Sequence, residues 1–143
     1  MKTAGLIALC VLLLSFTMDL PKTRIGLSNI RNTQGVVRIS VCATEDEFPY
    51  NPFRTYILTK DSLRDGKLQT TITDLDPGTY AISLLDDENN SGGMDYNFLG
   101  IPQEGYGFAN NVKPLLKCPD FKRCLVTLTE GENILEITVR YKN

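Results

Sequence analysis

The chain has 143 residues and is slightly acidic, with 15 Lys and Arg against 17 Asp and Glu and a formal net charge of −2. This length predicts one domain with its own core, and the charge balance excludes the basic surface of a nucleic-acid-binding protein. The absence of histidine excludes Ser-His-Asp and Cys-His catalysis within the chain and removes the commonest zinc ligand.

Residues 1–17 have the pattern of a secretory signal peptide. Lys2 gives a positive start, and an apolar run from Ala4 to Phe16 ends at a small-x-small cleavage site. The run is short for a membrane span, although an uncleaved N-terminal anchor is the alternative. We therefore expect residues 18–143 to lie in an extracytoplasmic space (periplasmic, secreted or at the outer surface), with no transmembrane span after cleavage.

Alternating apolar and polar residues predict strands in the first half of the domain. Residues 24–31 and 36–42 alternate on either side of a polar turn that ends in Gly35, which indicates a β-hairpin. Residues 45–54 contain two prolines and a charge cluster, so they predict a loop. We expect the aromatic side chains of this loop to cap the core rather than to form a binding surface. They are Phe48, Tyr50 and Phe53.

Further short strands are expected at residues 56–59 and 68–73. After a tight Asp-Pro-Gly turn, residues 79–85 form the strongest strand pattern in the chain, with Tyr80, Ile82 and Leu84 on one face. This strand leads directly into a polar, glycine-rich loop at residues 86–111. A strand end is where a rigid scaffold commonly presents function.

The first half of this loop has the spacing of an oxygen-ligand loop for calcium, D-x-N-x-S-G-x-x-D. Calcium takes about six to eight oxygen ligands, and a glycine permits the sharp turn that brings them together. The pattern departs from an EF-hand because Phe98 stands where the last carboxylate is expected and the flanks are not helical. The predicted Ca²⁺ ligands are Asp87, Asn89, Ser91 and Asp95, with a further carboxylate from Glu104 or Asp86. The alternative is a polar connection between strands.

The second half of the loop carries four aromatic residues that can stack on a ligand such as a sugar ring. They are Tyr96, Phe98, Tyr106 and Phe108. The alternative, which we favour, is a small hydrophobic cluster beneath the loop, since a long ordered loop needs packing of its own.

Two cysteines follow, separated by five residues. In an oxidising compartment, a disulfide between Cys118 and Cys124 is expected. Cys42 is then left over, buried or paired with either of the others, because sequence alone does not choose among the three possible bridges.

The last two strands, at residues 125–129 and 134–141, alternate around a polar turn and read as a second hairpin. The chain thus has about seven strands, no helix pattern and frequent turns. These features predict an all-β fold, an antiparallel β-sandwich of the immunoglobulin-like or prealbumin-like kind.

Three stretches carry a resemblance to a known family: residues 74–82 (DLDPGTYAI), 86–95 (DDENNSGGMD) and 97–111 (NFLGIPQEGYGFANN). They resemble domain-of-unknown-function family 2141 of bacteria, and the likeness extends over about residues 24–141. It implies an exported, small β domain of unknown activity. The family loop is typically D-E-N-G-N-G-K-L-D, and here Asn90 and Ser91 replace the first Gly and the second Asn.

Three functions are consistent with these observations. The first is a non-enzymatic extracytoplasmic domain whose loop binds Ca²⁺ and presents residues 96–111 to a protein or glycan partner. The second is a hydrolase that uses paired carboxylates, such as Asp87 or Asp95 with Glu104. The third is a purely structural envelope protein. We favour the first, because the sequence contains no complete catalytic constellation.

Overall fold

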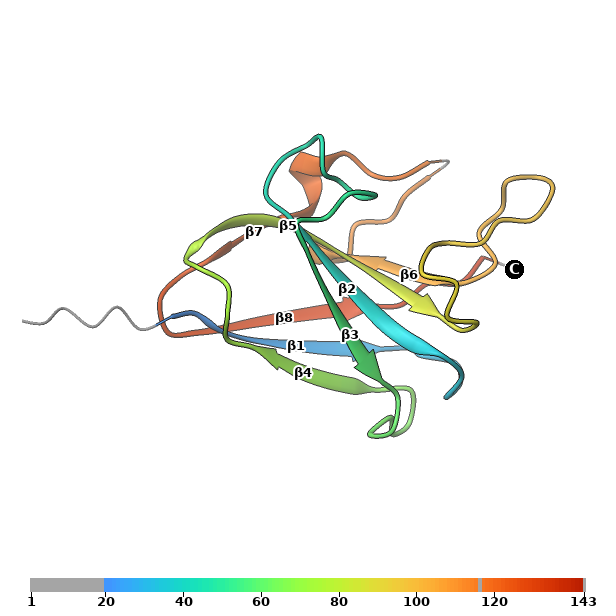
Figure 1. The fold of residues 1–143 in the computed structure, drawn as a ribbon, viewed down its shortest axis with the longest axis horizontal. Coiled ribbons are helices and arrows are strands. Elements are labelled where there is room, and N and C mark those ends of the chain that lie inside the picture. The colour runs from blue at the N-terminus through green and yellow to red at the C-terminus, as the bar shows by residue number, and fades with distance from the viewer. Residues whose placement is uncertain (1–19, 116, 143) are drawn as a thin grey trace, which may run out of the picture.

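The computed structural model describes residues 20–115 and 117–142, which form two packed β-sheets (Figure 1). The signal peptide predicted for residues 1–17 lies outside the described residues. The elements, in chain order, are β1 (Lys22–Ser28), β2 (Val36–Cys42), β3 (Arg54–Thr59), β4 (Leu68–Ile72), β5 (Gly78–Asp87), β6 (Gly105–Phe108), the 3₁₀ helices η1 (Ala109–Asn111) and η2 (Phe121–Cys124), β7 (Leu125–Leu128) and β8 (Glu132–Thr138).

The two sheets contain three and five strands. The smaller sheet has the order β4-β1-β8, and the larger has the order β3-β2-β5-β6 with β7 also paired to β5. β7 pairs with residues 78–81 of β5 and β6 pairs with residues 83–86, so these two short strands share one edge of the long strand. All pairs are antiparallel except β1 with β8. The predicted all-β sandwich is confirmed.

Both predicted hairpins are wrong. β1 and β2 do not pair with each other, because β1 joins the three-stranded sheet and β2 the five-stranded sheet. In the same way β7 pairs with β5, and β8 pairs with β1. Alternation specifies that one face of a strand is buried, but the edge at which it pairs depends on the rest of the chain. The members of these two pairs, β1 with β2 and β7 with β8, therefore lie in different sheets.

The main core lies between the sheets. Ile82 and Leu84 of β5 point into it, as the alternation predicted, and they pack with Val37, Ile39 and other buried side chains. The remaining members are Ile25, Leu27, Ile30, Val41, Leu68, Ile72, Leu75, Ala109, Leu128, Ile137 and Val139. The outward-facing residues of β5 are therefore free to build a site on the other side of the sheet.

The loop predicted at residues 86–111 is interrupted by strand β6. A Cβ at Gly105 would overlap Val139 and Tyr141, which follow β8, and a Cβ at Gly107 would lie 2.6 Å from the Ile137 Cγ2 atom of β8. The sequence gives these glycines the composition of a loop, but their role is to let two strands approach closely.

A second hydrophobic cluster lies on the outer side of the five-stranded sheet. Its buried members are Cys42, Ala81, Tyr106, Phe108, Val112 and Cys124. Phe48 packs on Phe108 and Phe121, with ring centroids 6.0 and 5.9 Å apart. The expected packing role of the aromatic residues in loop 45–54 thus holds for Phe48. Tyr50 and Phe53 are exposed by 72% and 47%.

The loops gather on one side and at one end of the sandwich. In Figure 1, residues 43–53 and η2 lie on the side opposite β1 and β4, and the loop formed by residues 88–104 extends beyond the end of β5. Within the described ranges, no helix is long and apolar enough to cross a membrane.

Candidate functional site

The base of loop 88–104 is organised by Asp87, the last residue of β5. Its carboxylate is fully buried and accepts hydrogen bonds from the backbone N–H groups of Ser91 (2.9 Å) and Gly92 (3.0 Å). The Nε of Arg38 donates to the same carboxylate at 2.5 Å. Gly92 has a φ of +92°, which favours glycine at this turn. Asp87 therefore links the start of the loop, at Ser91 and Gly92, to Arg38 of β2.

The far side of the loop is held by Glu104, which is only 4% exposed. Its two carboxylate oxygens accept hydrogen bonds from the backbone N–H groups of Glu88 (3.0 Å) and Asp95 (3.3 Å). Burial raises the pKa of the Glu104 carboxyl, although these two hydrogen bonds oppose the shift. Glu104 therefore joins the two ends of the segment that contains the predicted calcium ligands.

The remaining predicted ligands lie along the same turn. The Asn89 side chain bonds to Asp95 (Nδ2 to Oδ2, 2.6 Å), and the Ser91 hydroxyl bonds to the Gly93 carbonyl (2.9 Å). Asn89 Oδ1 also accepts the Ser91 N–H at 3.0 Å. Four of the five predicted ligands thus lie in the segment 87–95, and Glu104 joins them through hydrogen bonds to the backbone of that segment. Within residues 20–115 and 117–142, no group of three or more His, Cys, Asp or Glu side chains is arranged to hold a metal ion.

Asp86, the alternative ligand, points to the opposite face of β5 and is fully buried. It forms an ion pair with Lys60, whose ammonium group also donates to the Gln34 carbonyl at 2.5 Å. The Tyr141 hydroxyl donates to the second Asp86 oxygen at 2.5 Å. Burial, followed by this hydrogen bond, raises the pKa of Tyr141. Asp86 is thus committed to the interior of the sandwich and does not face the loop.

A second ion pair joins this interior network to the loop. The Arg31 guanidinium donates two hydrogen bonds to Glu88, at 2.6 and 2.7 Å, and lies 4.4 Å from the centre of the Tyr141 ring. Mainly because of the hydrogen bond from Arg31, the pKa of Glu88 is lowered. Both ends of loop 88–104 are therefore fixed to the sandwich by buried or partly buried charges.

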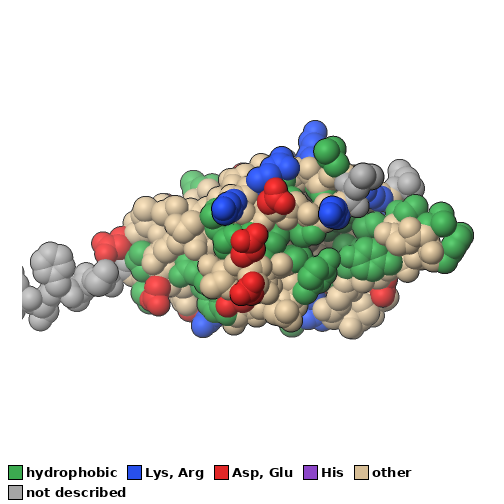
Figure 2. All heavy atoms as spheres, turned by 90° about the horizontal axis from the view of Figure 1, so that it is seen from above, with side chains coloured by type: hydrophobic (Ala, Val, Ile, Leu, Met, Phe, Trp, Pro, Cys, Tyr) green, Lys and Arg blue, Asp and Glu red, His purple; other side chains and the backbone are tan. Residues whose placement is uncertain are grey.

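The tip of the loop is ordered by Asn97. Its Oδ1 accepts the backbone N–H groups of Leu99 (2.9 Å) and Ile101 (3.0 Å), so the tip is a closed turn. Tyr96 is 52% exposed and Phe98 is 95% exposed. Figure 2 shows hydrophobic side chains gathered at the end of the molecule where this loop extends in Figure 1.

A groove of about 870 Å³ lies beside this loop, on the outer face of the five-stranded sheet. We call it the outer-sheet groove. Its floor consists of two rows of side chains that cross β3, β2, β5 and β6 in register. One row is Thr55, Ser40, Ser83 and Phe108, and the other is Ile57, Arg38, Leu85 and Tyr106.

The walls of the outer-sheet groove come from three loops. Tyr50 lies on one wall with its neighbours Pro49 and Pro52, and part of loop 88–104, including Met94 and Tyr96, forms another. Burial, followed by the neighbouring Tyr50 hydroxyl, raises the pKa of Tyr96. Pro114, Lys117, Cys118 and Lys142 complete the lining. Loops far apart in the sequence thus meet around one space.

Three of the four predicted binding aromatics line this groove. Tyr96 lies on a wall, whereas Tyr106 and Phe108 lie on the floor and also belong to the second hydrophobic cluster. Tyr106 and Phe108 therefore fit both predictions, the binding surface and the hydrophobic cluster beneath the loop. Phe98 is not among the lining residues.

The cysteines lie at one end of the outer-sheet groove. Cys42, Cys118 and Cys124 are free thiols in the structure, without the predicted Cys118–Cys124 bond. Cys118 lines the groove and packs against the cluster that contains the other two. Burial raises the pKa of Cys42 and Cys118 to about 11 and that of Cys124 to about 12.

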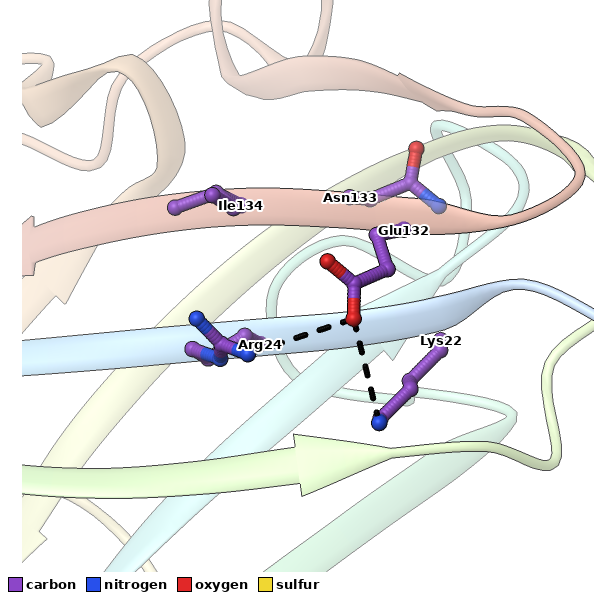
Figure 3. A pocket seen from close by; sticks show the side chains of 5 residues that line it. All are labelled: Lys22, Arg24, Glu132, Asn133 and Ile134. Atoms are coloured by element: carbon purple, nitrogen blue, oxygen red, sulfur yellow. Dashed lines mark ion pairs between the residues drawn. The ribbon is translucent and has the colours of Figure 1, made fainter.

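The outer face of the three-stranded sheet offers no comparable space. Figure 3 shows a hollow there, lined by Lys22, Arg24, Glu132, Asn133 and Ile134. Glu132 lies 3.8 Å from Lys22 Nζ and 4.0 Å from Arg24 Nη2. The hollow has no interior volume that holds a water-sized molecule.

The sequence analysis missed Arg38 and Tyr50 as site residues. Arg38 is a polar residue in an alternating strand, where a solvent-facing side chain is the ordinary interpretation. Its placement opposite Leu85 on β5 and Ile57 on β3 depends on strand pairing. Tyr50 was assigned to core packing with its neighbours. The sequence feature that could have identified Tyr50 as a site residue is the pair of prolines, which predict that residues 45–54 form a loop.

Comparisons with known proteins agree with the resemblance predicted from the sequence. A family model described as "Uncharacterized protein conserved in bacteria (DUF2141)" matches residues 25–136. This range contains loop 88–104 and nearly all of the groove lining. No curated protein and no solved structure matches the chain.

Proposed function

Because the chain belongs to the DUF2141 family of bacterial proteins, whose description names no activity, we propose a function from the site itself. The protein is an exported, non-catalytic binding domain that holds a glycan in the outer-sheet groove. The observation that carries this proposal is the groove of about 870 Å³ between loop 88–104 and residues 49–52. Ligand sites commonly have volumes of about 300–1,000 Å³.

The aromatic lining supports a glycan as the ligand. Tyr50 and Tyr96 come from two different loops of the wall, and Tyr106 and Phe108 lie on the floor with ring centroids 6.1 Å apart. Aromatic rings supply a flat apolar surface, and Ser40, together with the other hydroxyl groups of the floor, supplies hydrogen-bonding partners. A sugar ring has both kinds of surface.

The positions of the carboxylates support a non-catalytic role. Asp87 and Glu104, the candidate acid and base, are buried and accept hydrogen bonds from the backbone. No Asp or Glu is found among the groove-lining residues within the described part of the chain. A general acid or base must reach the reacting group, so these two carboxylates are better suited to holding the loop.

A glycan array probed with the purified protein tests the proposal. We expect binding to a subset of oligosaccharides, weakened about tenfold by Tyr50→Ala or Tyr96→Ala, since truncating a central aromatic contact costs on the order of 1.4 kcal/mol. Both side chains are more than half exposed, so the variants should fold. Phe98→Ala, on the same loop but outside the groove lining, is the matched control. The absence of binding to every oligosaccharide would contradict the proposal.

Calcium binding by loop 87–95 is a second proposal. The hydrogen bonds from Asn89 to Asp95 and from Ser91 to Gly93 bring oxygen-bearing groups of the loop within 3 Å of one another, and a hard cation binds such oxygens. The Arg38 guanidinium on Asp87 opposes a cation. We therefore expect weak binding, with a Kd of about 10⁻⁴–10⁻³ M as in other extracellular modules.

Thermal unfolding in EDTA and in millimolar calcium tests this second proposal. We expect calcium to raise the Tm of the unaltered protein but not that of Asp95→Asn, whose side chain lies at the surface of the loop. Magnesium at the same concentration is the control for ionic strength. Identical curves with and without calcium would exclude the ion.

A further inference from the structure

The charges that line the outer-sheet groove are all of one sign. Arg38, Lys117 and Lys142 line it, and the described lining residues include neither Asp nor Glu. The whole chain has more acidic than basic residues, so this is the reverse of its average composition. A cleft lined by charges of one sign attracts ligands of the opposite sign.

Arg38 occupies the centre of the groove floor. It lies between Ile57 and Leu85 in one row, and its neighbour on the strand, Ser40, lies between Thr55 and Ser83 in the next. Its side chain is 22% exposed, and Asp87 accepts a hydrogen bond from its Nε. This bond fixes the guanidinium. Within residues 20–115 and 117–142, the other guanidinium nitrogens of Arg38 have no hydrogen-bond acceptor, which leaves them available to a ligand.

The two lysines lie at the margin of the same space. Lys117 comes from the loop before η2, and Lys142 follows β8. Neither forms an ion pair with a described residue, whereas Lys60 and Arg31 elsewhere in the protein pair with Asp86 and Glu88. Unpaired cations around a fixed Arg suit an anionic ligand.

We propose that the occupant of the outer-sheet groove is an acidic oligosaccharide, one that carries uronic-acid carboxylates. A carboxylate binds Arg38 through charged hydrogen bonds, Lys117 and Lys142 attract further carboxylates, and the aromatic lining contacts the sugar rings. This inference rests on the proposed glycan-binding function and names the class of glycan. A neutral sugar would offer no negative charge to Lys117 and Lys142, or to the Arg38 nitrogens that do not bond to Asp87.

The test compares each acidic oligosaccharide with its own neutral form. Trimers of galacturonate, glucuronate-containing hyaluronan and mannuronate are each titrated beside the methyl ester, using the purified protein and calorimetry. We expect at least one acid to bind about tenfold or more tightly than its ester. The preference should shrink when salt rises from 50 to 500 mM, because salt screens exposed charges.

Variants assign the preference to the groove. Lys117→Gln and Lys142→Gln should each reduce the preference for the acid over its ester by about threefold or more. Lys113→Gln, an exposed lysine that does not line the groove, is the matched control. Arg38→Gln would leave the buried Asp87 without its partner, so the lysine variants carry the test even if that protein fails to fold.

The outcomes separate this inference from the proposed function. Equal binding of acid and ester, or binding of neutral sugars alone, would overturn the acidic ligand and leave glycan binding intact. A preference that Lys113→Gln reduces as much as Lys142→Gln does would also overturn it. Failure of every glycan to bind would overturn both proposals.

Discussion

On the outer face of the three-stranded sheet, Glu132 lies close to both Lys22 and Arg24, as Figure 3 shows, and 63% of its side chain is exposed. On the outer face of the five-stranded sheet, Asp87 is fully buried against Arg38. The first pair is surrounded by water and organises nothing around it. The second is covered by the loop it holds. Asp87 pairs with a cation and also accepts hydrogen bonds from two backbone N–H groups of the loop, whereas Glu132 pairs only with cations. A carboxylate therefore fixes the conformation of a loop when it accepts hydrogen bonds from the backbone of that loop.

The largest expected effect comes from removing the buried member of this comparison. Asp87→Ala should lower the free energy of unfolding by about 2–4 kcal/mol, because it leaves Arg38 and the N–H groups of Ser91 and Gly92 without their acceptor. Glu132→Ala should cost less than about 1 kcal/mol, since exposed ion pairs contribute little. Urea unfolding of both variants measures the contrast, and equal losses would break the comparison.

The closest approach of the two sheets gives the next effect. Gly107→Ala should destabilise the protein by about 1–3 kcal/mol, because its Cβ would overlap the Ile137 side chain and approach the Thr138 carbonyl at 3.3 Å. Gly93→Ala is the control, since nothing lies within 4 Å of a Cβ there. Urea unfolding compares the two, and a neutral Gly107→Ala would show that the sheets can separate without cost.

Acidification should remove the contribution of the Arg31–Glu88 ion pair to the free energy of unfolding. The pKa of Glu88 is lowered in the folded protein, chiefly by Arg31, so its contribution is complete above its unfolded pKa of 4.5 and is lost as the pH falls through the folded value. We expect Glu88→Gln to remove about 1 kcal/mol of stability at pH 7 and almost none at the lowest pH. Unfolding curves from pH 7 to pH 3 check this. A constant difference between the two proteins would contradict it.

Burial of Glu104 acts in the opposite direction. Its pKa is raised in the folded protein, so stability rises as the pH falls through that folded value toward 4.5. The Glu88 and Glu104 contributions therefore oppose each other near that range. The difference between unaltered protein and Glu88→Gln, rather than either curve alone, isolates the Arg31 pair.

The smallest expected effect concerns the reactivity of the thiols. Within the described residues, all of the cysteines lie on the five-stranded side. With pKa values of about 11 for Cys42 and Cys118, few thiolates exist at pH 8. Alkylation by iodoacetamide should be roughly 100-fold slower than for a solvent-exposed cysteine in a short peptide. We expect Cys118 to be modified first because it is less buried than the other two. Mass spectrometry follows the labelling. Fast reaction at Cys124 would contradict the buried cluster.

Alternation predicted most of the strands and their buried faces, but it missed β6, which lies inside the predicted loop. Ile82 and Leu84 point into the core as expected, and the oxygen-bearing spacing of residues 87–95 does form one compact turn. Pairing partners were not predictable, because β1 and β8 are far apart in sequence and their edges carry no residue-specific signal. The two hairpins were expected from short turns alone.

The site was predictable in its residue types but not in its assembly. Tyr96, Tyr106 and Phe108 were identified, and the structure adds Arg38 and Tyr50 from segments more than 40 residues away in sequence. Asp87 and Glu104 were interpreted as ligands because turn-forming and metal-binding carboxylates look alike in sequence. The structure adds that both carboxylates accept hydrogen bonds from backbone N–H groups of the loop, and the calcium site stays a prediction.

The parallel pairing of β1 with β8 has a consequence for synthesis of the protein. β1 lies at the centre of its sheet, and one of its two edges stays open until residues 132–138 have left the ribosome. The smaller sheet therefore cannot be completed before β8 has been synthesised, because that edge of β1 lacks its partner until then. Contacts this distant in sequence slow folding. Until the last strand arrives, the exposed edge of β1 can pair with other chains.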